Sequence, residues 1–453
     1  MRRRGCTHPL LQQLHQPKQP HWNPATIMTP SDLFPMPTLS RRNGTLTLET
    51  TPLTAIAESY GTPCYVYSEA AIRAAWAAYR EGLPPEAGTI HYAVKANSNL
   101  SILRLFAELG AGFDIVSGGE LERVVAAGGK PETVVFSGVG KVVWEIERAL
   151  ELGIGAFHVE SLPELERIAT IAQAHGVTAP ISFRVNPDVD PKTHPYIATG
   201  LARSKFGVTL DEARIGYRQA MDHPALSVVG VACHIGSQLI DDAPLIEAAE
   251  RIRRFVEELA DEGIRLTTID LGGGIGIRYR DESPLDVAQT LRRLRAVFAG
   301  RPERLAVEPG RSLVGAAGLL LTRVEYVKIR DDHTFFVVDA AMNDLMRPAL
   351  YEAWHEIVPV VDRPECLPRT GDVVGPVCET GDFLGLGRTL AVAVGDLLAV
   401  LCAGAYGMTM SSNYNTRPRA AEVLVRDSSH QLIRPREKRE QLWADEFALL
   451  PNA

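Results

Sequence analysis

The sequence is poor in cysteine, has no long apolar run and carries no excess of positive charge. Its six cysteines include no CxxC pair and no zinc-like grouping, so a reduced chain without a metal site is the simplest interpretation. The longest apolar runs, such as 397–405, are strand-sized and too short to span a bilayer. A formal net charge of −8 argues against nucleic acid or an anionic membrane as a partner. We therefore predict a soluble, cytoplasmic protein.

The composition is otherwise that of a globular protein, and its 453 residues exceed what one hydrophobic core usually supports, so two domains are expected. Residues 1–40 stand apart, because three arginines open a Pro-, Gln- and His-rich stretch with no acidic residue before Asp32. No apolar segment follows the arginines, which argues against a secretory signal, and a transit peptide would contain more serine. We expect a disordered extension or a mis-assigned start, with translation beginning at Met28 or Met36.

Between residues 69 and 315, short apolar strands alternate with helix-length amphipathic stretches, the pattern of βα units and a parallel sheet. The expected strands are 89–94, 112–116, 133–137, 156–159, 181–185, 228–234, 268–271 and 304–307. The expected helices include 100–109, 119–127, 162–175 and 244–262. Eight strands predict the α/β class, with a (β/α)₈ TIM barrel over residues 69–315.

After the barrel the pattern changes to apolar runs separated by turns, as in 319–329, 335–339 and 397–402. We predict a mainly β domain over residues 316–453. The stretch 46–53 is also strand-like, and we expect residues 41–68 to join this β domain, which would make it discontinuous in sequence.

In a barrel of this kind, catalytic groups gather where the strands end at the carboxyl face. Polar side chains follow several predicted strands: Lys95 and Asn97 in YAVKAN, His234 and Ser237 in HIGSQ, and Glu308 and Arg311 in EPGR. A lone lysine at a strand end is ordinarily a solvated side chain, but Lys95 is one of several polar residues that follow predicted strands of the same barrel. A lysine that forms a Schiff base needs a partly desolvated site where its amine can lose a proton, and the barrel mouth provides one.

A glycine run at 272–274 follows the seventh predicted strand. Without Cβ atoms these residues let backbone N–H groups approach an anion, although a flexible turn would also explain them. No GxGxxG occurs here, which argues against a dinucleotide fold, and barrels often bind phosphate after their last strands. On the residues alone, Glu308 and Arg311 could equally form a surface ion pair, and His234 could be a satisfied core histidine.

Four motifs, in order, resemble the alanine-racemase-like, barrel-type decarboxylases that use pyridoxal 5′-phosphate (PLP). They are YAVKAN at 92–97, HIGSQ at 234–238, GGG at 272–274 and EPGR at 308–311. The likeness runs from about residue 56 to about residue 425. Two further segments resemble the diaminopimelate decarboxylase family in particular: MRPALYEAWHEI at 346–357 and CETGDFLG at 378–385. The departures are the N-terminal extension and Ile275, where leucine is commoner.

The resemblance implies that Lys95 carries PLP as a Schiff base, that Glu308 faces the protonated pyridine nitrogen and that His234 stacks on the ring. The implied cofactor-binding residues are Lys95, His234, Ser237, Gly272, Gly273, Gly274, Glu308, Gly310, Arg311 and Tyr406. The implied substrate-binding residues are Arg311, Arg347, Tyr351, Glu379 and Tyr406, and the implied catalytic residues are Lys95, His234 and Cys378, the last as proton donor. Five positions are left out of this site because structural roles explain them nearly as well: Asp114, Ser117, Arg184, Asn186 and Lys205.

The resemblance also implies a homodimer in which the CETGD loop completes the active site of the neighbouring subunit. The implied substrate, meso-2,6-diaminopimelate, keeps one carboxylate after CO₂ leaves, and Arg311 and Arg347 can bind it bidentately. An ornithine-type substrate would present a bare ammonium there and would call for carboxylates instead. Cys378 lies beside Glu379 in a Gly-bounded loop, which favours an exposed acid over the commoner small buried hydrophobe.

We therefore predict decarboxylation of meso-2,6-diaminopimelate to L-lysine and CO₂, the last step of lysine biosynthesis through diaminopimelate. One alternative is a decarboxylase of the same superfamily that acts on ornithine, lysine, arginine or carboxynorspermidine. The other is a PLP-binding homologue that keeps the fold but has lost the chemistry.

Overall fold

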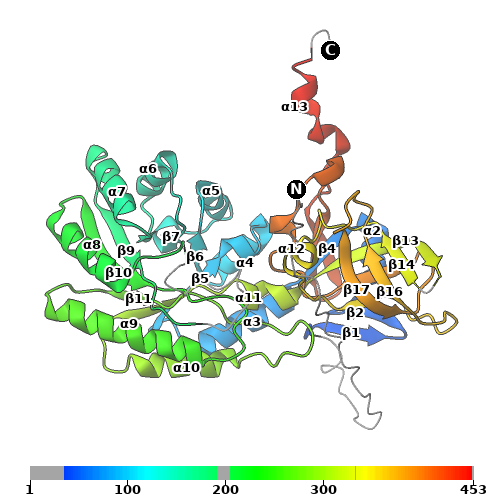
Figure 1. Cartoon of the computed structure of the whole chain (residues 1–453), viewed down its shortest axis with the longest axis horizontal. Coiled ribbons are helices and arrows are strands. Elements are labelled where there is room, and N and C mark those ends of the chain that lie inside the picture. The colour runs from blue at the N-terminus through cyan, green and yellow to red at the C-terminus, as the bar shows by residue number, and fades with distance from the viewer. Residues whose placement is uncertain (1–34, 191–204, 332, 451–453) are drawn as a thin grey trace, which may run out of the picture.

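The computed structural model describes residues 35–190, 205–331 and 333–450. Most of the predicted N-terminal extension, including Met28, lies outside the described residues, whereas Met36 is buried. Figure 1 shows two bodies side by side, a barrel ringed by helices and a mainly β unit.

The barrel is closed by eight parallel strands in the order β10-β11-β12-β5-β6-β7-β8-β9. Their bounds are β5 (Gly88–Ala93), β6 (Gly112–Ile115), β7 (Val134–Phe136), β8 (Ala156–Val159), β9 (Ala179–Arg184), β10 (Leu226–Ala232), β11 (Thr268–Asp270) and β12 (Arg304–Val307). Each lies within a few residues of a predicted strand. The apolar strands are buried on both faces, as is usual for a parallel sheet. The closed order of the eight strands confirms the predicted α/β barrel.

Helices cover the outside of the barrel (Figure 1). They are α3 (Glu69–Gly82), α4 (Leu100–Glu108), α5 (Gly118–Ala126), α6 (Val143–Leu152), α7 (Leu162–Ala174), α8 (Leu210–Asp222), α9 (Ala243–Asp261) and α10 (Val287–Val297). The hydroxyls of Ser117 and Ser161 cap α5 and α7 by accepting hydrogen bonds from Glu120 N and Glu164 N. These caps begin each helix just after a strand, which leaves only a short loop at the mouth.

The second body is a mainly β unit whose sheet follows the order β17-β16-β14-β13-β4-β19-β20, with β15 and β18 joined to its side. Its elements are β4 (Cys64–Ser68), β13 (Gly318–Arg330), β14 (His333–Val338), α12 (Arg347–Tyr351), β15 (Ile357–Pro359), β16 (Arg369–Val374), β17 (Phe383–Leu390), β18 (Leu397–Val400), β19 (Ala421–Arg426) and β20 (Ser429–Arg434). The early strand β4 runs antiparallel to β13 and parallel to β19. A short helix, α11 (Arg311–Val314), leads from the barrel into this unit.

The strands nearest the N-terminus form a separate three-stranded sheet of β1 (Leu39–Arg42), β2 (Thr45–Leu48) and β3 (Thr51–Pro52), followed by α2 (Leu53–Tyr60). It touches the β unit through the hydrogen bond from Leu46 N to Val360 O, 2.7 Å long. The predicted strand at 46–53 therefore pairs mainly within its own small sheet. The predicted domain boundaries stay a prediction.

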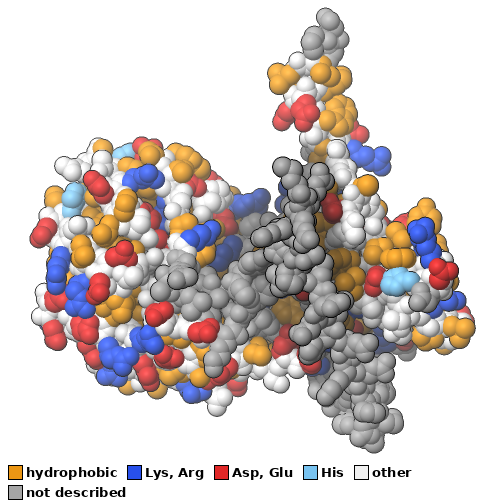
Figure 2. All heavy atoms as spheres, in the orientation of Figure 1, with side chains coloured by type: hydrophobic (Ala, Val, Ile, Leu, Met, Phe, Trp, Pro, Cys, Tyr) orange, Lys and Arg blue, Asp and Glu red, His pale blue; other side chains and the backbone are white. Residues whose placement is uncertain are grey.

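The chain ends in an arm that projects from the β unit, made of η7 (Arg439–Leu442) and α13 (Ala444–Phe447) and drawn red in Figure 1. Trp443, Phe447 and Leu449 are 45%, 49% and 85% exposed, and hydrophobic side chains stand out along the arm in Figure 2. Short 3₁₀ turns elsewhere are 94–96, 131–133, 315–317, 408–410 and 414–416. No helix among the described residues has the length and apolarity needed to cross a membrane.

Candidate active site

The carboxyl ends of the barrel strands open onto a cavity of about 490 Å³ that shares its wall with a second cavity of about 390 Å³. Lys95, Phe206, His234, Ser237, Arg311 and Tyr406 line both. Glu308, Gly274 and Gly310 line the first, and Arg347 and Tyr351 of the β unit line the second. Most of the residues predicted from the sequence therefore meet at one place, between the barrel and the β unit.

Lys95 lies in the turn after β5, and its Nζ pairs with the carboxylate of Asp114 on the neighbouring strand β6. Burial lowers the pKa of Lys95, but attraction to Asp114 and Glu308 outweighs it, so the pKa is raised. Asp114, which is fully buried, thus holds Lys95 as an ammonium. The sequence predicted a desolvated lysine but not this partner, and the only signal was an aspartate within an apolar strand.

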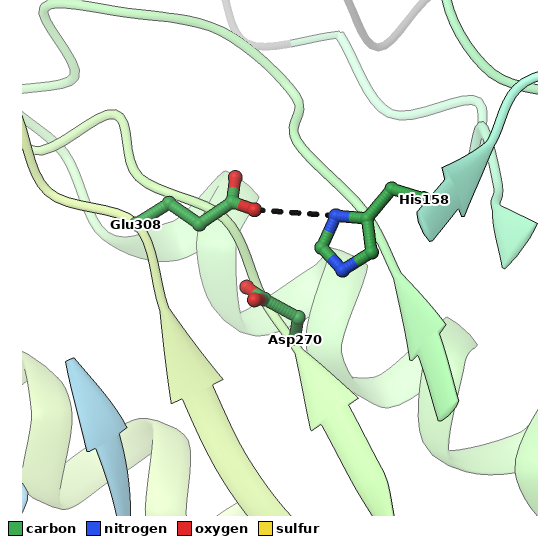
Figure 3. A group of neighbouring side chains, drawn as sticks. All are labelled: His158, Asp270 and Glu308. Atoms are coloured by element: carbon green, nitrogen blue, oxygen red, sulfur yellow. Dashed lines mark ion pairs between the residues drawn. The ribbon is translucent and has the colours of Figure 1, made fainter. Parts of the chain in front are cut away.

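Glu308 follows β12 and faces His158 and Asp270 across the barrel interior (Figure 3). The ligand atoms of these three residues lie within 4.8 Å of one another, a grouping that could hold a metal ion. Burial, and then repulsion from Glu308, raise the pKa of Asp270 well above its ordinary value, which favours its neutral form. A protonated carboxyl is a poor metal ligand, which favours a hydrogen-bonding group over a metal centre. That no metal is required stays a prediction.

The geometry fits the pyridine ring that the sequence implied. Glu308 Oε1 is buried, lies 3.3 Å from His158 Nδ1 and receives no hydrogen bond from the described residues. His158 Nδ1 is also 3.1 Å from Ser137 Oγ, so it is not committed to Glu308. A buried acceptor without a donor is costly, and a protonated ring nitrogen is the kind of donor it lacks.

The glycine run shapes the adjoining wall. A Cβ at Gly273 would lie 2.3 Å from Glu308 O, and one at Gly274, whose φ is +117°, would lie 2.4 Å from Gly236 O. The N–H of Gly272 already donates to Asp270 and that of Gly273 to His234 Nδ1, at 2.8 and 3.3 Å. The first two glycines therefore allow close packing of the loops, while Gly274 itself lines the cavity.

His234 presents a neutral ring to both cavities. Its Nδ1 accepts the Gly273 N–H, and burial, with the charges of Arg184 and Lys95, lowers its pKa to about 3. A neutral imidazole can stack on a ring without adding charge.

The second cavity is lined by two arginines. Arg311 donates to Ser237 Oγ at 3.1 Å and to the Tyr279 hydroxyl at 2.6 Å, and Arg347 donates to His355 Nε2 at 2.8 Å. Among the described residues, neither guanidinium forms an ion pair with a carboxylate. Arg311 also lies over the ring of Tyr406, 4.9 Å from its centroid. Two buried guanidiniums with neutral partners make this cavity suited to an anion.

Cys378 and Glu379 lie outside the lining of both cavities, as the described residues define it. Both are exposed. Their loop is held by Asp382, which accepts hydrogen bonds from Met342 N and Val377 N at 2.6 and 2.7 Å. The structure of one chain thus brings together the predicted barrel residues and Arg347, but not the CETGD loop.

Several residues around the pocket were missed or set aside by sequence reasoning: Asp114, His158, Asp270, Tyr279 and His355. All five are buried, and Asp114, His158 and Asp270 interrupt apolar strands, where a polar residue is the only sign of a role. Tyr279 and His355 stand among charged neighbours, where the sequence gives no such sign. Of the positions set aside, Arg184 lines the first cavity and pairs with Glu160 at 3.2 Å, whereas Ser117 caps a helix.

Residues 69–315 match the family described as the pyridoxal-dependent decarboxylase, pyridoxal binding domain. The chain is 54% identical over 417 residues to the diaminopimelate decarboxylase of Pseudomonas aeruginosa, covering 92% of this chain and 100% of the relative. It is 53% identical over 406 residues to that of Neisseria meningitidis serogroup A, covering 90% and 100%.

Solved structures agree. Diaminopimelate decarboxylase from Helicobacter pylori, complexed with L-lysine, superposes with a TM-score of 0.85 at 42% identity, covering 88% of this chain and 100% of that one. The M. jannaschii enzyme superposes with a TM-score of 0.87 at 38% identity, covering 92% and 99%. A lysine/ornithine decarboxylase from Vibrio vulnificus, at 22% identity and a TM-score of 0.73, covers 83% and 97% and shares the fold alone. The chain therefore belongs to the diaminopimelate decarboxylases, a family of PLP-dependent carboxy-lyases.

Proposed function

We propose that the chain decarboxylates meso-2,6-diaminopimelate to L-lysine and CO₂, the last step of lysine biosynthesis through diaminopimelate. The observation that carries this proposal is the pair of buried guanidiniums, Arg311 and Arg347, which line the same cavity as Lys95 and have hydroxyls and an imidazole as hydrogen-bond partners. A carboxylate that survives the reaction matches them in charge and hydrogen bonding. A bare ammonium at the same place would face two like charges.

At the cofactor end, Lys95 would hold PLP, with Glu308 as acceptor for the ring nitrogen and His234 against the ring. Ser237, Gly274, Gly310, Arg311 and Tyr406 would hold the phosphate, and Gly272 and Gly273 would allow the loops around it to pack closely. When bound, PLP supplies an electron sink for the electron pair released as the C–C bond to CO₂ breaks. Asp114 is placed to hold the proton of the Lys95 ammonium.

At the substrate end, Arg311, Arg347 and Tyr351 would grip the carboxylate that is retained. Fixing that end would orient the other stereocentre, the one that loses its carboxylate, toward Lys95. Reaction at that carbon breaks one C–C bond and replaces the carboxylate with a proton. The thiol of Cys378 would deliver this proton, and Glu379 would bind the substrate's amino group.

Cys378 and Glu379 line neither cavity of their own chain, which supports a homodimer in which each subunit contributes its CETGD loop to the other. The exposed apolar side chains of the C-terminal arm also support a second copy, since large exposed apolar groups usually mark an interface. We further propose residues 1–40, 41–68, 69–315 and 316–453 as the domain limits. A reducing compartment, the cytoplasm, suits the five described cysteines, which are all unpaired.

The reaction is tested by incubating the purified holoenzyme with meso-diaminopimelate. We expect stoichiometric lysine and CO₂. Turnover of ornithine or arginine with no lysine formed from diaminopimelate would contradict the proposal and favour the related decarboxylases. Binding of PLP without turnover of any of these amino acids would favour the non-catalytic homologue.

The cofactor link is tested by borohydride reduction followed by peptide mapping. We expect a pyridoxyl group on the peptide containing Lys95, and an adduct on another lysine would overturn this assignment.

The shared site is tested by mixing two inactive variants, Lys95→Ala and Cys378→Ala, after dissociation and reassociation. If the loop acts across the interface, half of the dimers contain both variants and each of these has one intact site, so about a quarter of the wild-type activity returns. No recovery in dimers shown to have exchanged subunits would indicate that Cys378 serves its own chain.

A further inference from the structure

His355 lies in the segment between α12 and β15, next to the substrate end of the pocket, and it is fully buried. Its Nε2 contacts Arg347 Nη1 at 2.8 Å, and its Nδ1 contacts the backbone oxygen of Leu401 at 2.8 Å. Both ring nitrogens are therefore committed to fixed partners. The ring also packs edge-on against Tyr279, with centroids 5.3 Å apart.

These two partners decide where the imidazole carries its proton. A carbonyl oxygen can only accept, so Nδ1 must be the N–H, and a guanidinium can only donate, so Nε2 must be bare. A doubly protonated ring would lose the bond to Arg347 and place two positive charges together. Burial and the charge of Arg347 accordingly lower the pKa of His355 well below its ordinary value.

The neutral ring has a consequence for the charge of the pocket. Arg347 is held by an acceptor that carries no negative charge, and Tyr279, whose ring centroid lies 4.7 Å from the guanidinium carbon, contributes a phenol and not a carboxylate. Elsewhere in the β unit, Arg363 is instead paired with Asp396 at 2.7 Å. A carboxylate in place of His355 would hold Arg347 equally well but would cancel the charge that the substrate needs.

We propose that His355 is a positioning residue that sets substrate specificity: its neutral imidazole aims the Arg347 guanidinium into the pocket without compensating its charge. The pocket then favours ligands whose far end bears a carboxylate. This inference rests on the proposed function, because it explains how that function distinguishes diaminopimelate from simple diamines and diamino acids.

The test compares two ligands of the holoenzyme by calorimetry. L-Lysine keeps the carboxylate that Arg347 would bind, and 1,5-diaminopentane is the same molecule without it. In His355→Leu we expect lysine to bind about 10- to 30-fold more weakly, whereas the affinity for diaminopentane changes less than about 2-fold. The KM for meso-diaminopimelate should rise by a similar factor, with kcat altered less than about 3-fold.

Two further variants separate this role from a merely structural one. His355→Gln retains a neutral acceptor and should restore most of the lysine affinity. His91→Leu removes another buried histidine, one that lines neither cavity, and should leave the ratio of lysine to diaminopentane affinity unchanged. If His355→Leu weakens both ligands equally, or leaves lysine binding intact, the proposal is wrong.

Should His355→Leu fail to fold, His355→Gln and His355→Glu carry the test. Relative to diaminopentane, His355→Glu should bind lysine at least about 10-fold more weakly than His355→Gln, because the introduced carboxylate compensates the charge of Arg347. Equal ratios would overturn the proposal. These binding measurements do not depend on the proposed reaction. If the proposed reaction is itself wrong, the wild-type chain will form no lysine from diaminopimelate.

Discussion

The two ends of the pocket are built from different parts of the molecule and carry opposite charge. The cofactor end belongs to the barrel, where Lys95 follows β5, Asp114 pairs with it from the neighbouring strand β6, and Glu308 follows β12 on the other side. The substrate end lies where the barrel meets the β unit, and there Arg311 and Arg347 have only hydroxyls and an imidazole as partners. One end thus offers unpaired acceptors and the other uncompensated cations.

The difference shows how one pocket can orient a substrate with similar ends. Diaminopimelate carries an amino group and a carboxylate at each stereocentre, so contacts of shape alone distinguish its ends poorly. An acidic end that binds a protonated ring and amine, and a basic end that binds a carboxylate, favour one orientation electrostatically. Removing a charged group at the acidic end should therefore lower mainly kcat, and removing one at the basic end should raise mainly KM.

The largest effect is expected from Lys95→Ala, which removes the amine at the centre of the acidic end. Because the reaction depends on that amine, kcat should fall about 10⁴-fold or more. Lys130→Ala, at an exposed position, is the matched control and should retain full activity. Steady-state assays with meso-diaminopimelate measure both, and a Lys95→Ala enzyme within 10-fold of wild type would refute the assignment.

Glu308→Gln keeps the size of the side chain but removes its charge. The ring nitrogen would then lose its anionic partner, so we expect kcat to fall about 10²- to 10³-fold, with a shift in the cofactor's absorption maximum. An unchanged spectrum together with normal kcat would show that Glu308 does not face the ring. In that case the grouping with His158 and Asp270 would need another explanation.

Arg347→Ala tests the basic end. Loss of a buried, charge-assisted contact should reduce kcat/KM for meso-diaminopimelate about 10²-fold, mainly through KM, with the cofactor's absorbance unaltered. Arg363→Ala is the matched control, because that arginine is already paired with Asp396 and lies outside both cavities. Equal losses in the two variants would remove the contrast between the ends.

The smallest effect concerns stability below neutral pH. The native chain keeps His355 unprotonated, whereas the unfolded chain protonates it below about pH 6.5. The unfolded state then binds more protons, so the free energy of unfolding decreases as the pH falls. His355→Gln should reduce this slope by up to about 1.4 kcal/mol per pH unit between pH 6 and 5. Denaturant titrations at several pH values measure the difference, and identical slopes would mean that His355 is protonated in the native chain.

The strands and helices of the barrel could be predicted because each repeats a short apolar run followed by an amphipathic helix. The strands 156–159 and 304–307 were predicted with their observed limits, and the other six barrel strands to within two residues. The segment 46–53 was harder, since a strand pattern states that a segment is half-buried but not which strand will pair with it. Residues 45–48 pair with the adjacent strand β1, whereas β4 pairs with β19 of the C-terminal sheet.

By itself, the sequence determined the barrel, the residues at its mouth and the family, because strand ends, glycines and ordered motifs are local features of the chain. Only the tertiary structure decided which charges meet. It placed Asp114 against Lys95, left Glu308 without a donor and gave Arg347 a neutral histidine as partner. It also left the CETGD loop outside its own pocket. The protonation and charge of a buried group depend on neighbours that are distant in sequence, and packing alone brings those neighbours together.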